Sequence, residues 1–240
     1  MSTHAHRITH RARIRPTTRA PGAFSVRFAA VAGAVFFALF IIFCVLTNGT
    51  PSITASGQDT FNYISAHHGR LQLAAVVMGL AMPAALLFVS GLFPALRQAE
   101  GGIAGVAVAA LGGGVLAAAT TVTGALIVGV TASRITEIGP AGSRVWWTMY
   151  LMSLGATLLG LLLLIGATAV ICLRAQLFAR WFAIASAALA LVSIAGAFTI
   201  GYATTAVGAV AGIAVILDSV WIFLASIFLW RDPSVALPDG

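Results

Sequence analysis

The amino-acid sequence predicts an all-α protein, a polytopic transmembrane bundle of six spanning helices with both termini in the cytoplasm. The first observation is composition: 60% of the 240 residues are hydrophobic and 8% are charged, whereas an average soluble domain carries roughly 25% charged residues. The second is six long runs that hold at most one charge each. About 20 helical residues cross a hydrocarbon core of ~30 Å, and the backbone in lipid must bond within itself. The third observation is an uneven distribution of arginine, which sets the orientation.

The N-terminal segment 1–27 is predicted to be a disordered, basic, cytoplasmic tail. It holds six of the thirteen arginines and no acid, and so accounts for six of the seven net positive charges. Charge gathered in one tail differs from the basic face of a nucleic-acid-binding protein, and no nucleic-acid partner is expected. Positive segments remain on the cytoplasmic side, where this tail is expected to meet anionic lipid headgroups.

The first three spans are predicted at 28–47, 71–96 and 103–132, and none of them contains a charged residue. The first is longer than the 7–15 apolar residues of a cleavable signal peptide, and we interpret it as an uncleaved anchor. Pro83 is expected to kink the second span, because proline removes a hydrogen bond of the helix.

The third span carries a small residue at every fourth position, from Gly105 to Gly129. Small residues let helix backbones approach closely in lipid, so we place this helix at the centre of the bundle. The run 112–114 is three glycines. We interpret it as a close-packing site, with a hinge as the alternative.

The last three spans are predicted at 146–173, 181–202 and 207–230, followed by a short cytoplasmic tail at 231–240. The first two are uncharged, and the third contains Asp218 alone. This arrangement places ten arginines on the cytoplasmic side and three outside. Tryptophan and tyrosine are enriched at membrane interfaces. The predicted outer interface is marked by Tyr63, Trp146, Trp147 and Tyr202. The predicted inner interface is marked by Trp181 and Trp230.

The host is inferred from the basic residues, all of which are arginine. Arginine without lysine, with abundant alanine and glycine, is typical of GC-rich codons. We infer a bacterium, and therefore the plasma membrane.

Asp218 is the sharpest chemical feature of the sequence. It is the twelfth residue of its predicted 24-residue span, and an acid near the midplane costs roughly 2.5–3.5 kcal/mol on insertion scales. No arginine, lysine or histidine lies in any predicted span. Asp218 must therefore be protonated, bonded to hydroxyl groups or bound to a cation. Candidate partners at similar depth are Thr121, Thr123, Thr157 and Ser193, with the indole of Trp221 one turn away. A coupling site is one interpretation, and a neutral carboxyl that ties two helices together is the one we favour.

The outer loop 48–70 contains a second polar group. Asp59 is predicted to be the N-cap of a short interfacial helix that leads into the second span. His67 and His68 are adjacent, and adjacent residues on a helix point ~100° apart, so no metal site is predicted. Arg134 and Glu137 are expected to form an exposed pair. The sequence also lacks a phosphate-binding loop, a zinc motif and a nucleophile elbow, and no cofactor is predicted.

Several short segments resemble a broad group of uncharacterised six-helix integral membrane proteins of GC-rich actinobacteria. The resemblance covers roughly residues 28–231. It implies the same six-helix architecture but transfers no activity and no residue role. It is carried by Phe61-Asn62-Tyr63 and Gly69-Arg70-Leu71-Gln72, by Leu96-Arg97-Gln98-Ala99-Glu100, by Ala179-Arg180-Trp181-Phe182, and by Val220-Trp221-Ile222 with Ser226.

Three functions are compatible with these features of the sequence. The favoured one is a non-enzymatic accessory or scaffold protein of the cell envelope, with a membrane-protein partner or a second copy of the chain. The alternative is a small proton- or cation-coupled transporter that uses Asp218. The third is a membrane enzyme at the outer interface that uses Asp59, His67 and His68.

Overall fold

The structure is a computed structural model that describes residues 23–101, 105–200 and 205–231. Most of the predicted basic tail, Tyr202 and the C-terminal tail from 232 lie outside the described residues. The described elements are α-helices, each long and apolar enough to cross a membrane, which confirms the predicted all-α, six-span fold. They are α1 (Ala23–Leu46), α2 (Gly57–Ala99), α3 (Gly105–Ser133), α4 (Ile135–Ala175), α5 (Arg180–Thr199) and α6 (Thr205–Arg231).

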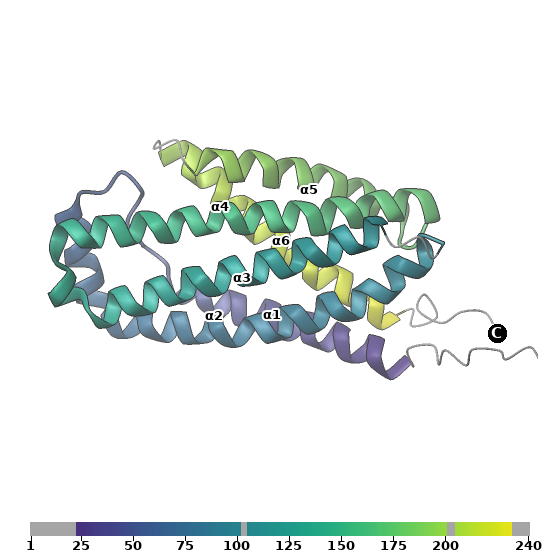
Figure 1. The fold of residues 1–240 in the computed structure, drawn as a ribbon, viewed down its shortest axis with the longest axis horizontal. Coiled ribbons are helices and arrows are strands. Elements are labelled where there is room, and N and C mark those ends of the chain that lie inside the picture. Colours follow the sequence, from purple (N-terminus) through teal and green to yellow (C-terminus); the bar gives the residue numbers. More distant parts are fainter. Residues whose placement is uncertain (1–22, 102–104, 201–204, 232–240) are drawn as a thin grey trace, which may run out of the picture.

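The helices form one elongated bundle in which consecutive helices pack side by side and α6 returns to α1 (Figure 1). The start of α1 and the end of α6 lie at the same end, which we call the tail end. The opposite end, with Tyr63 and Trp147, is the loop end. Trp181 and Trp230 lie at the tail end, where Trp181 packs on Phe228 with 5.9 Å between ring centroids. These four aromatic residues therefore lie two at each end of the bundle, while their assignment to an outer and an inner membrane interface stays a prediction.

The centre of the bundle is occupied by α4 and not by α3, so that expectation was wrong. Helix α4 packs on α2, α3, α5 and α6, whereas α3 packs mainly on α2 and α4. The small residues of α3 do mark close approach. A methyl group at Gly113 would clash with α4, and one at Gly114 would lie 2.7 Å from Val89 of α2. The close-packing interpretation of the glycine run is thus confirmed for these two, while Gly112 has open space beside it.

Helices α2 and α4 begin earlier than predicted, because the polar segments at the loop end continue them. The N-cap of α2 is Ser56, and the prediction of Asp59 for that role was wrong. The Ser56 hydroxyl accepts a bond from the Asp59 amide at 3.0 Å and lies 2.6 Å from its carboxylate. The Ser56 hydroxyl thus caps a backbone amide of the first turn, and the Asp59 carboxylate accepts a hydrogen bond from that hydroxyl.

The extended helices change direction at specific residues. In α2 the helical dihedral angles are interrupted at His67 (φ −121°, ψ 17°), whereas the residues around Pro83, the predicted kink, remain helical. In α4 the interruption is at Gly139 (φ 66°, ψ 179°), a conformation accessible essentially only to glycine. Pro140 follows it and starts the long part of the helix.

The turn between α2 and α3 is closed by Glu100, a contact that sequence reasoning missed. Its carboxylate accepts bonds from the backbone amides of Val106 at 2.8 Å and Ala107 at 2.9 Å. A carboxylate at a helix N-terminus satisfies free amides and interacts favourably with the helix dipole. Glu100 therefore bonds the end of α2 to the first turn of α3 at the tail end.

Candidate functional site

Asp218 lies between α5 and α6 and is fully buried, with 0% of its surface exposed. The Ser193 hydroxyl lies 3.0 Å from Oδ1 and 3.2 Å from Oδ2 of the carboxyl group. Ser193 also lies 3.0 Å from the carbonyl oxygen of Leu189 in its own helix. The contact joins two neighbouring helices through one carboxyl and one hydroxyl group. Among the four predicted site residues, these two are brought together.

The other two predicted partners, Thr121 and Thr157, meet each other and not Asp218. Their hydroxyl oxygens are 3.2 Å apart, and Thr120 lies 3.0 Å from the same Thr157 hydroxyl. This threonine cluster ties α3 to α4. Thr123 is exposed and bonds to Ala119 in its own helix. The predicted polar core is therefore two separate helix–helix contacts.

The sequence suggested Trp221 as a hydrogen-bond partner of Asp218. In the structure Trp221 donates to Ser186 instead. Its indole N–H lies 2.7 Å from the Ser186 hydroxyl, and both residues are buried. Ser186 precedes Ser193 by two helical turns, so both serines face α6. The long side chain of Trp221 thus reaches Ser186, two turns along α5 from the serine that Asp218 contacts. Sequence reasoning missed Ser186, although its seven-residue spacing from Ser193 was a usable signal.

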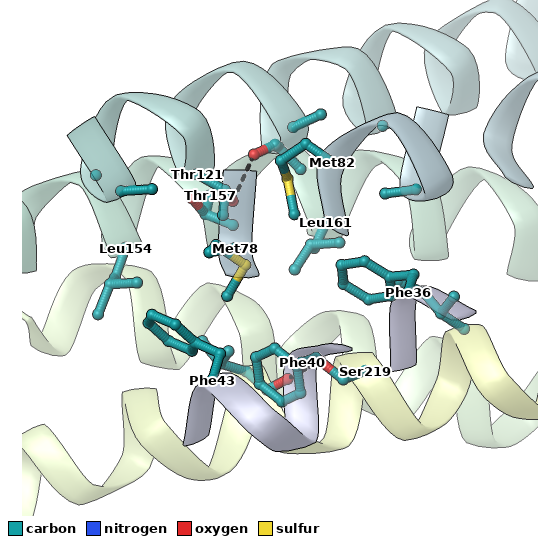
Figure 2. A pocket seen from close by; sticks show the side chains of 18 of the residues that line it. Phe36, Phe40, Phe43, Met78, Met82, Thr121, Leu154, Thr157, Leu161 and Ser219 are labelled. Carbon is teal, nitrogen blue, oxygen red and sulfur yellow. Dashed lines mark hydrogen bonds between the residues drawn. The ribbon is translucent and has the colours of Figure 1, made fainter. Parts of the chain in front are cut away.

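A mainly apolar cavity of about 70 Å³ lies where α1, α2, α3, α4 and α6 converge (Figure 2). Phe36, Phe40 and Phe43 of α1 face it from one side, and the threonine cluster stands on the opposite side (Figure 2). Met78 and Met82 of α2 project into it. Neither Asp218 nor Ser193 lines this cavity. The buried acid and the internal space are thus separate features of the bundle.

The predicted polar group at the loop end is divided among local contacts. His67 Nδ1 lies 2.9 Å from the Tyr63 carbonyl oxygen, and the two rings stack at 4.4 Å. His68 Nδ1 lies 3.0 Å from the Ser65 carbonyl oxygen, while Asp59 is held by Ser56. Within the described ranges, no three histidine, cysteine or acidic side chains could hold a metal ion together.

Two residues instead fasten the loop between α1 and α2. The Arg70 guanidinium donates to the Asn48 carbonyl oxygen and to the Tyr63 hydroxyl, both at 2.7 Å. Trp147 of α4 donates its indole N–H to the Pro51 carbonyl oxygen at 3.0 Å. These bonds hold the loop against α2 and α4.

A shallow groove runs along the outside of the bundle between α2 and α3, in the half nearer the loop end. We call it the α2–α3 groove. Small residues form much of it, and its loop end carries the side chains of Gln72 and Ser133. Its other lining residues are Ala75, Val76, Gly79, Val122, Ala125, Leu126, Gly129 and Val130.

Comparisons of the chain with protein-family models, with curated proteins and with solved structures gave no match. The resemblance to actinobacterial six-helix proteins stays a prediction from the sequence.

Proposed function

We propose that the chain is a non-enzymatic, multi-pass accessory or scaffold protein of the plasma membrane. In this proposal a helix of a partner membrane protein packs into the α2–α3 groove. The groove is the observation that carries the proposal, because small residues let a second backbone approach where lipid supplies no hydrophobic drive for association.

The contacts in the groove suit a helix. A methyl group at Gly79 would meet nothing within 4 Å, and one at Gly129 would meet only the Ala75 side chain, at 3.3 Å. Val76 and Leu126, which flank these positions, are 59% and 63% exposed. The half-buried amide of Gln72 makes no hydrogen bond to any residue of the described ranges. Interhelical hydrogen bonds from glutamine stabilise helix pairs in membranes, so Gln72 would supply a polar contact to the partner.

The geometry favours this role over coupled transport through Asp218. A coupling acid needs a path for its ion, and intramembrane acids in transporters face a polar or water-filled cavity. Asp218 is bonded to Ser193, and the nearby cavity is lined almost entirely by apolar groups. These observations support a neutral carboxyl that joins α5 to α6.

The proposed topology has both termini in the cytoplasm. It is supported by the excess of arginine in the segments that would be cytoplasmic and by the shared position of the start of α1 and the end of α6. A reporter active only in the cytoplasm, fused after residue 240, is expected to be fully active. Activity of the complementary periplasmic reporter at that position would overturn the proposed orientation.

The partner is tested by photo-crosslinking in the host membrane. A photoreactive residue at Val76 or Leu126 is expected to give a discrete adduct with one other membrane protein, identified by mass spectrometry. Leu191 on α5, 67% exposed, is the matched position outside the groove and is expected to crosslink to lipid alone. An adduct between two copies of the chain would show that the groove binds a second copy of the same protein, in a homo-oligomer. Lipid adducts at all three positions would contradict the proposal.

A second experiment fills the groove. The double variant Gly79→Leu/Gly129→Leu is expected to abolish the adduct at Leu126 while the folded bundle remains. Gly112→Leu adds the same side chain to another glycine with open space beside it, outside the groove, and is expected to leave the adduct intact. Equal loss in both variants would indicate a general defect and not an occupied groove.

A further inference from the structure

A second groove lies on the outside of the bundle at the tail end, between α1 and α6. We call it the α1–α6 groove. Small and aliphatic side chains of α1 form one wall, and larger side chains of α6 form the other. Its lining residues are Ala30, Val31, Ala34, Phe223, Ser226, Ile227, Trp230 and Arg231. Deeper in the membrane it closes, because Phe37 of α1 stacks on Phe223 with 4.8 Å between the ring centroids.

The mouth of this groove is positively charged. The Arg27 guanidinium lies over the Trp230 ring, 5.7 Å from the centroid. Arg231 follows Trp230 in the chain and lines the groove itself. Both arginines are exposed, and neither forms a salt bridge with an acid of the described ranges, where Arg134 pairs with Glu137. Arg27 thus covers the Trp230 ring, and Arg231 supplies a second positive charge to the lining at the same end of the α1–α6 groove.

We infer that the α1–α6 groove binds one anionic phospholipid of the adjacent leaflet. One acyl chain lies along Ala30 and Ala34 and ends near the Phe37–Phe223 contact. The phosphate is held between Arg27 and Arg231, since guanidinium groups form charge-assisted, bidentate bonds to phosphate. Trp230, near the end of α6, is 52% exposed, and tryptophan is a residue type enriched at the level of lipid headgroups.

Charge and shape act together in this assignment. Basic pockets between membrane helices bind anionic headgroups. A free phosphate has no acyl chain, so it would make no contact with the apolar part of the α1–α6 groove. A zwitterionic lipid would fill the groove equally well and interact less favourably with the two guanidinium groups. The groove is therefore expected to select by headgroup charge and to retain lipid by its acyl chain.

Native mass spectrometry of the detergent-purified protein tests the inference. The protein is mixed with phosphatidylglycerol and phosphatidylcholine of identical acyl chains. One phosphatidylglycerol is expected to be retained about tenfold more than phosphatidylcholine. Glycerol phosphate, which has the charged group without the chains, is expected not to be retained. Equal retention of the two lipids by the wild-type protein would overturn the inference, and retention of glycerol phosphate would assign the site to free phosphate.

Variants distinguish lipid binding in the α1–α6 groove from a general electrostatic attraction of anionic lipid to the protein. Arg27→Gln/Arg231→Gln is expected to reduce phosphatidylglycerol retention to the phosphatidylcholine level. Arg97→Gln/Arg174→Gln removes the same charge from the last turns of α2 and α4 and is expected to leave retention unchanged. Ala34→Leu fills the groove, keeps both arginines, and is expected to lower the retention of both lipids. Equal loss from the two double variants would show that only net charge matters.

Discussion

Gly113 of α3 and Gly160 of α4 face each other so closely that neither position has room for a side chain. A methyl group at Gly113 would lie 2.6 Å from the Gly160 carbonyl oxygen, and one at Gly160 would lie 2.8 Å from the Gly113 carbonyl oxygen. The two backbones are therefore in direct contact at this point. Because α4 is the central helix, this contact fixes α3 against the core.

The first prediction concerns this contact. Gly113→Ala and Gly160→Ala are each expected to lower the free energy of unfolding by about 1–3 kcal/mol, the usual effect of overpacking. Gly112→Ala, one residue away with open space beside it, is expected to be neutral or to stabilise by up to about 1 kcal/mol through helix propensity. Reversible unfolding in mixed micelles measures all three. Similar values for Gly112→Ala and Gly113→Ala would show that the backbones are not in contact.

The second prediction concerns the bond between α5 and α6. Ser193→Ala leaves the buried Asp218 carboxyl without its hydroxyl partner, and an unsatisfied buried polar group costs about 1–3 kcal/mol. Asp218→Asn keeps a group able to bond Ser193 and is expected to change stability by less than about 1 kcal/mol. The double variant Ser193→Ala/Asp218→Leu is expected to recover most of the loss, because neither polar group remains.

The same unfolding assay measures these three variants. Recovery in the double variant is the decisive result, because it separates a structural bond from a charge that the protein needs for another purpose. A double variant no more stable than Ser193→Ala would contradict the structural role of the pair.

The third prediction concerns the cap on α3. Glu100→Ala is expected to destabilise the bundle by about 1–2 kcal/mol, since two backbone amides lose their acceptor. The matched acid is Glu137, whose ion pair with Arg134 is about two-thirds exposed on each side. Such pairs contribute ~1 kcal/mol or less, so Glu137→Ala is expected to have little effect. Equal losses in the two variants would refute the capping role of Glu100.

The fourth prediction concerns the loop between α1 and α2. Arg70→Gln and Trp147→Phe each remove hydrogen bonds to its carbonyl groups. Hydrogen exchange at residues 48–56 is expected to quicken several-fold, because local opening of a loop depends on few bonds. Arg134→Gln, at the same end of the bundle, is the control. Unchanged exchange in both loop variants would show that packing alone holds the loop.

The six helices could be predicted because crossing a hydrocarbon core demands long apolar runs, and such runs are visible in the sequence. The additional N-terminal length of α2 and α4 could not be predicted from the sequence. Their loop-end segments are polar, and a helix there depends on caps such as Ser56 and on the glycine conformation at Gly139. The exposed pair of Arg134 and Glu137 was predicted correctly, because its geometry depends only on local spacing.

The candidate site was predicted only in part, because depth in the membrane does not specify a neighbour. Thr121, Thr157 and Ser193 are predicted at similar depths, yet of these three only Ser193 bonds to Asp218. Helix rotation and adjacency decide the partner, and these follow from the whole bundle. The same reason explains why the small residues of α3 indicated close packing correctly and a central position wrongly.

The cavity beside Phe40 makes the stability of the bundle sensitive to hydrostatic pressure. Pressure favours the state of smaller volume, and the volume change of unfolding scales with the voids that unfolding removes. A void of about 70 Å³ corresponds to roughly 40 mL/mol if it is lost completely, within the span reported for whole proteins. Because α1 packs chiefly on α2 and α6, it borders this void on the side facing α3 and α4. Compression is therefore expected to move α1 inward before it disturbs the α3–α4 contact.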